Sequence, residues 1–274
     1  KGGGSFEPGA HGSSTPPGGC SLSKRRFSVT APRSMDNRAV KPLGIKSYGS
    51  IGHLPGSRLG PGDHHCHEGQ ARICTIQTRD RHDVVIVQEK LDGSCVSIAK
   101  VNGEILALGR AGYLAQTAPY EHYQRFAAWV RKHAARFDAL LHERERLCGE
   151  WLLLAHGTRY ELPHEPFVAF DLFTEKNTRT PYLVFLARLD GKFVSPREIS
   201  IGPPRSLEWV RARLNPSGHG ALDPVEGGVW RVERRGLVDF LAKWLRPDKV
   251  DGCYLPEISN LPPIWQGYRG TPEA

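Results

Sequence analysis

The residue of this chain with the clearest catalytic potential is a lysine that directly follows a strand predicted to be buried. Lys90 comes after the apolar residues 84–87 and is followed by Asp92 and Gly93. A cationic amine in such a position is costly unless it is paired or takes part in a reaction. Lysine amines act as nucleophiles once they are deprotonated, so the pattern favours covalent catalysis. A surface strand that ends in a turn would read the same way, because Asp-Gly is itself a turn sequence.

Further segments with charged residues follow Lys90 in order. They read Gly109-Arg110-Ala111-Gly112, Gly149-Glu150-Trp151-Leu152, Phe167-Val168-Ala169-Phe170-Asp171, Val225-Glu226-Gly227-Gly228-Val229-Trp230-Arg231 and Leu241-Ala242-Lys243-Trp244. Each segment alone has an ordinary interpretation. Glu150 and Glu226 would be strand residues on a solvated face, and Phe170 would be a core aromatic residue.

The elements that must position these residues are mainly strands. The patterns predict strands over residues 84–89, 94–100, 104–110, 147–154, 167–173, 228–234 and 237–245. Asn102-Gly103 predicts a two-residue hairpin between the second and third strands. A long helix is predicted over 123–141 from its apolar spacing, with Pro119 and Glu121 near its start, and a short helix over 206–214. So many strands with few crossover helices predict an α+β fold with mostly antiparallel sheets and flanking helices.

Composition narrows the class of protein. The net charge of +8 over 274 residues favours a polyanionic partner such as nucleic acid or a nucleotide, although a generally basic surface gives the same count. No apolar run approaches the length of a membrane span, so a soluble, cytoplasmic protein is expected. The six cysteines show no disulfide-scaffold spacing, which favours reduced thiols.

The N-terminal part of the chain differs from the rest. Residues 1–34 are rich in Gly, Ser and Pro and predict a disordered arm, and Met35 is the only methionine. Met35 is read as a natural start of translation, with a leader or transit peptide as the alternative. Residues 35–274 are predicted to form one catalytic domain. The cluster His64-His65-Cys66-His67, with Cys74, lacks the paired spacing of structural zinc sites and is interpreted as a loop.

The six segments from Lys90 to Lys243, in this order, resemble the covalent nucleotidyltransferase superfamily over roughly residues 84–246. The chain looks most like ATP-dependent RNA ligases of the phage and bacterial nick-sealing type. The resemblance implies the nucleotidyltransferase (ATP-grasp-like) domain of polynucleotide ligases. It also implies that Lys90 attacks the α-phosphate of ATP and carries AMP covalently.

The resemblance assigns roles to the other residues. Arg110 and Lys243 would help to lower the pKa of Lys90, and Lys243 would also hold the α-phosphate. Glu226 would bind Mg²⁺ or Mn²⁺, which neutralises the departing pyrophosphate, and Glu150 would hold the ribose or a second metal ion. The remaining assignments concern the nucleotide: Phe170 stacks on adenine, Glu89 or its backbone reads the base edge, and Arg110 contacts the ribose or an RNA 5′-phosphate. Asp92 is counted among the nucleotide-binding residues, with shaping of the Asp-Gly turn as its alternative role.

Two features depart from the family pattern. Its last motif usually has two lysines separated by one residue, but position 245 is Leu, and whether Arg246 substitutes is left open. About 30 residues follow Lys243, too few for the C-terminal OB-fold of DNA ligases and capping enzymes. The sequence therefore predicts an ATP-dependent RNA ligase that joins an RNA 5′-phosphate to a 3′-hydroxyl. A DNA ligase, a GTP-dependent capping guanylyltransferase and an inactive nucleic-acid-binding module remain alternatives, and action within a larger repair assembly stays open.

Overall fold

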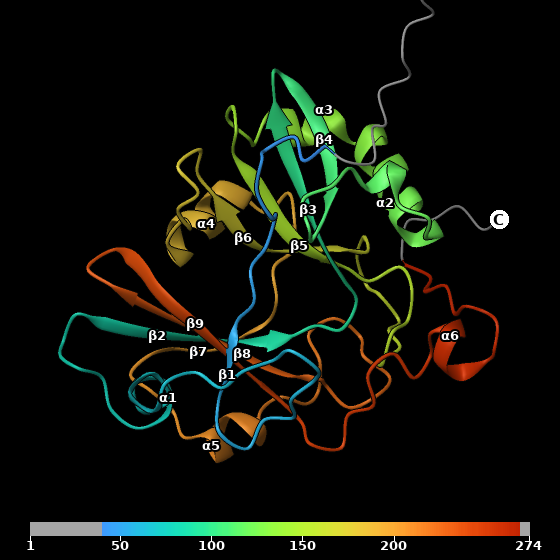
Figure 1. Cartoon of the computed structure of the whole chain (residues 1–274). Coiled ribbons are helices and arrows are strands. Elements are labelled where there is room, and N and C mark those ends of the chain that lie inside the picture. The colour runs from blue at the N-terminus through green and yellow to red at the C-terminus, as the bar shows by residue number, and fades with distance from the viewer. Residues whose placement is uncertain (1–39, 269–274) are drawn as a thin grey trace, which may run out of the picture. The chain divides into compact units, whose positions relative to one another are not determined.

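The computed structural model describes residues 40–268, and their strands form two sheets (Figure 1). The predicted disordered arm, residues 1–34, lies outside the described residues. The first sheet has the order β1-β9-β8-β2-β7 and the second β4-β3-β5-β6. Every strand pair is antiparallel except β1 with β9. The α+β class with mostly antiparallel sheets is therefore confirmed.

The first sheet carries Lys90 at the end of its strand β2. Its strands are β1 (Gly52–His53), β2 (Asp83–Lys90), β7 (Glu198–Gly202), β8 (Gly227–Arg234) and β9 (Leu237–Leu245). Side chains alternate along β2, so Val85 and Val87 pack in one cluster with Trp230, while Ile86 joins the core under the second sheet. The same alternation places Lys90 on the face of Ile86 and Glu89 on the opposite face. Helices α1 (Glu68–Thr75) and α5 (Leu207–Arg211) cover the face of Val85 and Val87.

The second sheet supplies the other wall of the site. Its strands are β3 (Ser94–Val101), β4 (Glu104–Gly109), β5 (Arg146–Trp151) and β6 (Phe167–Phe173). The predicted hairpin joins β3 to β4, with positive φ at both Asn102 and Gly103. Helices α2 (Glu121–Lys132), α3 (Ala134–Asp138) and α4 (Tyr182–Leu189) pack on this sheet through an aromatic core that includes Phe126, Trp151 and Phe167. In Figure 1 they lie in the upper half with this sheet.

The single long helix predicted over 123–141 is wrong, because the chain leaves helical geometry at His133 and forms α2 and α3. The break lets Phe137 stack on Phe193, with ring centroids 4.8 Å apart, and lets Arg136 pair with Glu165 at 2.7 Å. Tertiary contacts thus override a helical period that continues through the break.

Several elements were not predicted. No element was predicted before residue 84, yet β1 and α1 form there, and β7, α4 and α6 (Pro256–Ser259) were missed as well. A short 3₁₀ turn, η2 (Ala115–Thr117), precedes α2. His67 stands at the N-cap of α1 and Cys74 is buried within it, so the predicted loop continues into a helix. The described cysteines are free thiols. In the described part of the chain no helix is long and apolar enough to cross a membrane.

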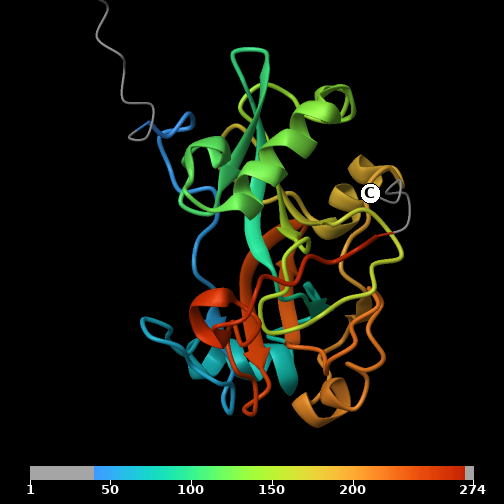
Figure 2. The same cartoon turned by 90° about the vertical axis from the view of Figure 1, so that its right-hand side faces the viewer.

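The segment after β9 pairs with the chain that connects β5 to β6. Bridges join Leu154 to Trp265 and Leu162 to Tyr268, and the Gln266 side chain donates to the Leu152 carbonyl. Figure 2 shows this segment (red) crossing in front of the sheets, with α6 on the way. The C-terminal segment therefore borders the space between the strand ends.

Candidate active site

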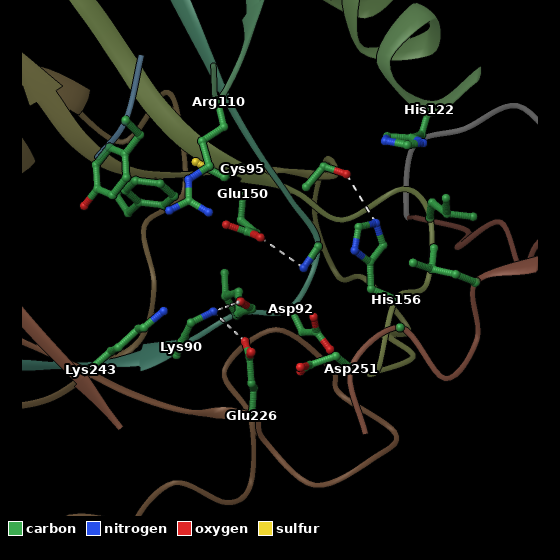
Figure 3. A pocket seen from close by; sticks show the side chains of 18 of the residues that line it. Lys90, Asp92, Cys95, Arg110, His122, Glu150, His156, Glu226, Lys243 and Asp251 are labelled. Carbon is green, nitrogen blue, oxygen red and sulfur yellow. Dashed lines mark hydrogen bonds and ion pairs between the residues drawn. The ribbon is translucent and has the colours of Figure 1, made fainter. Parts of the chain in front are cut away.

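One cavity of about 970 Å³ brings the predicted site residues together. It is lined from β2, β5, β6, β8, β9 and the C-terminal segment. All eight residues named from the sequence border it: Glu89, Lys90, Asp92, Arg110, Glu150, Phe170, Glu226 and Lys243. Residues up to 154 positions apart in the chain therefore share one site, and Figure 3 shows how most of them lie.

Lys90 is ion-paired with Glu226 at the centre of this cavity. In the antiparallel register Lys90 lies opposite Gly227, so Glu226 reaches the end of β2. The Lys90 Nζ lies 2.6 Å from Glu226 Oε2 and also donates to the Leu91 carbonyl at 3.2 Å. Burial alone would lower the pKa of Lys90, but Glu226, Glu150 and Asp92 outweigh it and raise the pKa. The lowered pKa expected from the sequence is therefore not found in the free protein, where Lys90 is an ammonium ion.

Glu226 is buried and has a cation on each carboxylate oxygen. Its Oε2 pairs with Lys90 and its Oε1 pairs with Lys249. Burial would raise the pKa of Glu226, yet the two lysines lower it, so the carboxylate is ionised. The backbone here is tightly packed, since a Cβ on Gly227 would lie 1.9 Å from the Trp244 carbonyl oxygen.

Glu150 holds the turn after Lys90 from the second sheet. Its Oε1 accepts a hydrogen bond from the Gly93 amide at 3.0 Å. Gly93 is required there, because a Cβ would lie 2.6 Å from the Trp151 carbonyl oxygen. Burial, with Glu226 and Asp92 nearby, raises the pKa of Glu150 to about 7, although Lys90 opposes this. Glu150 therefore exchanges a proton near neutral pH and can donate to or accept from a ligand hydroxyl.

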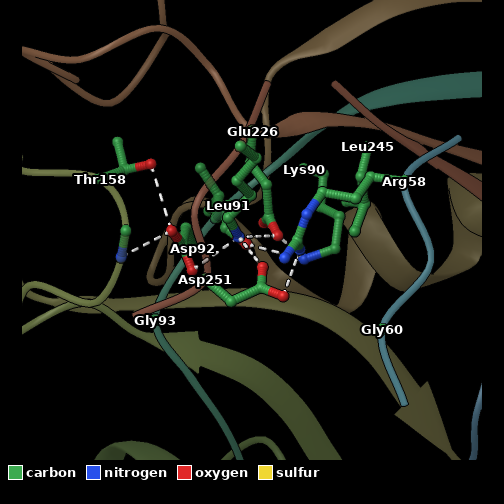
Figure 4. A network of polar contacts seen from close by, with 12 residues as sticks. Arg58, Gly60, Lys90, Leu91, Asp92, Gly93, Thr158, Glu226, Leu245 and Asp251 are labelled. Atoms are coloured by element: carbon green, nitrogen blue, oxygen red, sulfur yellow. Dashed lines mark hydrogen bonds and ion pairs between the residues drawn. The ribbon is translucent and has the colours of Figure 1, made fainter. Parts of the chain in front are cut away.

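Asp92 is locked into the turn, as one of its interpretations predicted. Its Oδ2 accepts from the Gly157 amide at 2.9 Å and the Thr158 hydroxyl at 3.3 Å. Its Oδ1 lies 3.2 Å from the Lys249 Nζ. Figure 4 shows Asp92 between Thr158 and the Glu226 cluster.

Glu89 lines the cavity, but its carboxylate is engaged elsewhere. It accepts from the Ser217 hydroxyl, from the Gly218 amide at 2.9 Å and from Arg197 Nε at 3.3 Å. These contacts follow from the alternation along β2, which turns Glu89 away from the face of Lys90. Of the two readings of Glu89, the one through its backbone is therefore favoured.

Lys243 and Arg110 are the two cations predicted beside Lys90. The Lys243 Nζ is 3.5 Å from Asp63, and burial together with Lys90 lowers the pKa of Lys243. Arg110 is exposed, and within residues 40–268 its guanidinium makes long contacts of 3.5 Å with the Gly49 carbonyl and the Ser50 hydroxyl. Arg110 is thus loosely held and free to meet an anionic ligand.

Phe170 is partly exposed in the cavity rather than fully buried in the core. Its ring meets Tyr48 edge-on at 5.0 Å, and the Tyr48 hydroxyl donates to Asp171 at 2.7 Å. Asp171 in turn pairs with the buried Arg231 and with Arg179. This buried network holds the Phe170 ring in place.

The lining residues that were not singled out from the sequence include Tyr48, His156 and Lys249. His156 contacts the Ser94 hydroxyl at 3.2 Å, and burial lowers its pKa to about 4. Lys249 had a signal, because Lys249-Val250-Asp251-Gly252 repeats the pattern of residues 90–93. Arg246 does not border the cavity and pairs with Asp248 at 2.7 Å.

The carboxylates of the cavity form at most part of a metal site. Among the residues that the structure describes, no three His, Cys, Asp or Glu side chains are grouped to hold a metal ion. Mg²⁺ commonly takes one or two carboxylates and completes its shell with substrate phosphates and water. Glu226, ionised and at the cavity, fits such a partial site.

The site thus consists of a cavity between two mostly antiparallel sheets, with a lysine at the end of β2 paired with a glutamate that directly precedes β8. A family model described as RNA ligase matches residues 83–245, more than half of the chain. The chain therefore belongs to the RNA ligase family. No curated protein matches it.

Solved structures of ligases are similar to the chain at low identity. An archaeal ATP-dependent RNA ligase is 21% identical, with a TM-score of 0.36, over 60% of this chain and 42% of that one. A variant of Naegleria gruberi RNA ligase with ATP and Mn is 18% identical, with a TM-score of 0.45, over 79% and 63%. A putative ATP-dependent DNA ligase from Aquifex aeolicus is 15% identical, with a TM-score of 0.43, over 72% and 49%. The chain thus spans less than half of the archaeal ligase that it matches.

Proposed function

We propose that this protein is an ATP-dependent RNA ligase that works through a covalent Lys90–AMP intermediate. Lys90 displaces pyrophosphate from ATP, and the AMP then passes to an RNA 5′-phosphate. An RNA 3′-hydroxyl displaces the AMP and seals the strand. The observation that carries the proposal is the Lys90–Glu226 ion pair at 2.6 Å inside a cavity that Glu150, Phe170 and Lys243 also line.

Each of the residues that line the cavity would contact a different part of the nucleotide or the RNA. Phe170 offers a partly exposed ring for the adenine, and Glu150, able to donate or accept a hydrogen bond, suits the ribose hydroxyls. Lys243 would hold the α-phosphate beside Lys90. Arg110, loosely held at the exposed edge, would meet the ribose or the RNA 5′-phosphate. The Lys90 ammonium must lose its proton before it attacks.

Glu226, with Glu150 as the second carboxylate, would hold a Mg²⁺ or Mn²⁺ ion. Such an ion neutralises the charge of the departing pyrophosphate. Glu226 then has two functions in this chain: it positions the Lys90 Nζ before reaction, and it offers an ionised oxygen at the phosphate site.

The test is covalent labelling with ATP radiolabelled in its α-phosphate. The parent protein should form an adduct that is labile to acid and stable to base, as a phosphoramidate is. Lys90→Arg and Lys90→Ala should both form none, because arginine keeps the charge but lacks a readily deprotonated amine. Lys100→Arg is the matched control, since Lys100 pairs with Asp138 and does not border the cavity.

The other possible results of this labelling experiment point to a different mechanism or function. Peptide mapping that places AMP on another residue, or strong labelling of Lys90→Arg, refutes the mechanism. Preference for labelled GTP would keep the lysyl intermediate and turn the function to capping. An adduct that seals nicked DNA but no RNA ends would indicate a DNA ligase, and no adduct at all would indicate a binding module.

A further inference from the structure

A second lysine is buried against the same glutamate as Lys90. Lys249 lies in the turn after β9 and is only 5% exposed. Its Nζ contacts Glu226 Oε1, Asp92 Oδ1 at 3.2 Å and Asp251 Oδ1 at 3.6 Å. Burying a lysine costs free energy, and here three carboxylates around its ammonium group offset that cost. The carboxylates of this cluster appear in Figure 4, where Asp92, Asp251 and Glu226 converge.

The position of Lys249 relative to Lys90 is set by a single carboxylate. Lys90 binds one oxygen of Glu226 and Lys249 binds the other. Both lysines line the cavity. Lys90 can attack only a phosphorus atom next to its Nζ, so the reacting phosphate must come close to Lys249 as well.

The chain also lacks a cation where the family pattern has one. Leu245 is buried, with its backbone opposite Gly227, and Arg246 is held by Asp248 outside the cavity. Lys243 therefore remains as the cation from the end of β9 that lines the cavity. Lys249 comes six positions later and reaches the same space through the turn.

We propose that Lys249 binds an oxygen of the α-phosphate beside Lys90, and so supplies the phosphate contact that Leu245 cannot make. This inference rests on the proposed function and adds a residue to it. Lys249 begins the second Lys-x-Asp-Gly sequence of the chain, but it is not the nucleophile. Its side chain is 4% exposed against 22% for Lys90, and three carboxylates surround it.

The experiment measures nucleotide binding without chemistry. Isothermal titration with Mg²⁺ and the α,β-methylene analogue of ATP, and separately with AMP, compares the parent with Lys249→Met and Lys249→Arg. Loss of one charged phosphate contact should weaken both ligands about tenfold or more in Lys249→Met, and Lys249→Arg should recover most of it. Lys192→Met is the matched control, because the Lys192 side chain pairs with Asp190 at the surface, does not line the cavity and should leave affinity unchanged.

A purely structural Lys249 gives a different result. Lys249→Met would then melt at a lower temperature but bind both ligands as the parent does, which overturns the inference. Weakened binding of the analogue with unchanged binding of AMP overturns it too, because AMP carries only the α-phosphate.

If Lys249→Met does not fold, the inference is tested in the parent protein. With ¹³Cε-labelled lysine, the Lys249 signal, assigned by its loss in Lys249→Arg, should shift when the analogue saturates the site; no shift overturns the inference. The adduct assay on the parent separates the two proposals. If Lys90 forms the adduct but Lys249 has no role in binding, only this inference is refuted. If AMP is found on Lys249, then Lys249 is the nucleophile and this inference is refuted. If no adduct forms, the proposed function itself is refuted.

Discussion

His219 is a buried histidine whose neutral form is fixed by its neighbours. Its Nε2 accepts from the Arg197 amide at 3.2 Å, so its Nδ1 carries the proton and donates to His164 Nε2 at 2.8 Å. His164 donates in turn to the Glu165 carbonyl at 2.7 Å. A proton on His219 Nε2 would face the Arg197 N–H, one donor against another. We therefore predict that acid destabilises the fold through His219.

The magnitude follows from the shifted pKa. Burial, then His164 and Arg197, lower the pKa of His219 to about 3, against 6.5 when unfolded. The folded state thus binds fewer protons, so the stabilisation is complete above pH 6.5 and is lost as the pH falls. The loss is about 1.4 kcal/mol for each pH unit below 6.5, or roughly 2 kcal/mol at pH 5. His156 adds a loss of the same sign over its own range.

Urea unfolding at pH 7, 6 and 5 measures this effect. In His219→Gln the free energy of unfolding should fall less steeply below pH 6.5, by about 1.4 kcal/mol per pH unit. His142→Gln, at an exposed histidine, should follow the parent. Equal slopes for the parent and His219→Gln would refute the reasoning. The effect bears on function because Arg197 also binds Glu89, the residue before Lys90.

Two predictions concern nucleotide binding and transfer. Phe170→Ala should weaken ATP binding by roughly 1 to 3 kcal/mol, the usual range for stacking on a base, while Phe170→Tyr should keep most of it; titration showing equal affinity for Phe170→Ala would remove the stacking role. Glu226→Ala should slow adduct formation by about 10²-fold or more at saturating ATP, on the scale of one electrostatic contact. A labelling rate within a few-fold of the parent would take Glu226 out of the site.

Patterns of local sequence accounted for most of the fold that positions the site. The strands that carry Lys90, Glu150, Phe170 and Lys243, and the strand that follows Glu226, were all predicted, because each is an apolar run with turns at its ends. The missed elements depend on distant partners. Strand β7 forms because Glu198–Gly202 pairs with β2, and β1 has two residues that pair with β9. Such pairing leaves little periodicity in the sequence.

The sequence named residues that line one cavity, but it did not predict the contacts that they make there. Glu89 and Lys90 are neighbours in sequence, yet strand alternation turns their side chains to opposite faces. The raised pKa of Lys90 arises from Glu226, Glu150 and Asp92, which come from three separate segments. The direction of such a pKa shift depends on the distances between charged groups in the folded protein, so it could not be predicted from the amino-acid composition.

The two Lys-x-Asp-Gly sequences show how context decides chemistry. Lys90 ends a central strand, opposite Gly227, and its amine remains accessible from the cavity. Lys249 lies in a turn after the end of β9, and it pairs with Asp92 of the first Lys-x-Asp-Gly sequence. Asp92 is held by the Gly157 amide and the Thr158 hydroxyl. The aspartate of the first Lys-x-Asp-Gly sequence therefore positions Lys249, the lysine of the second. In the proposed mechanism the same four-residue pattern therefore yields one lysine that attacks the α-phosphate and one that binds it, and their difference comes from the strand and the turn that present them.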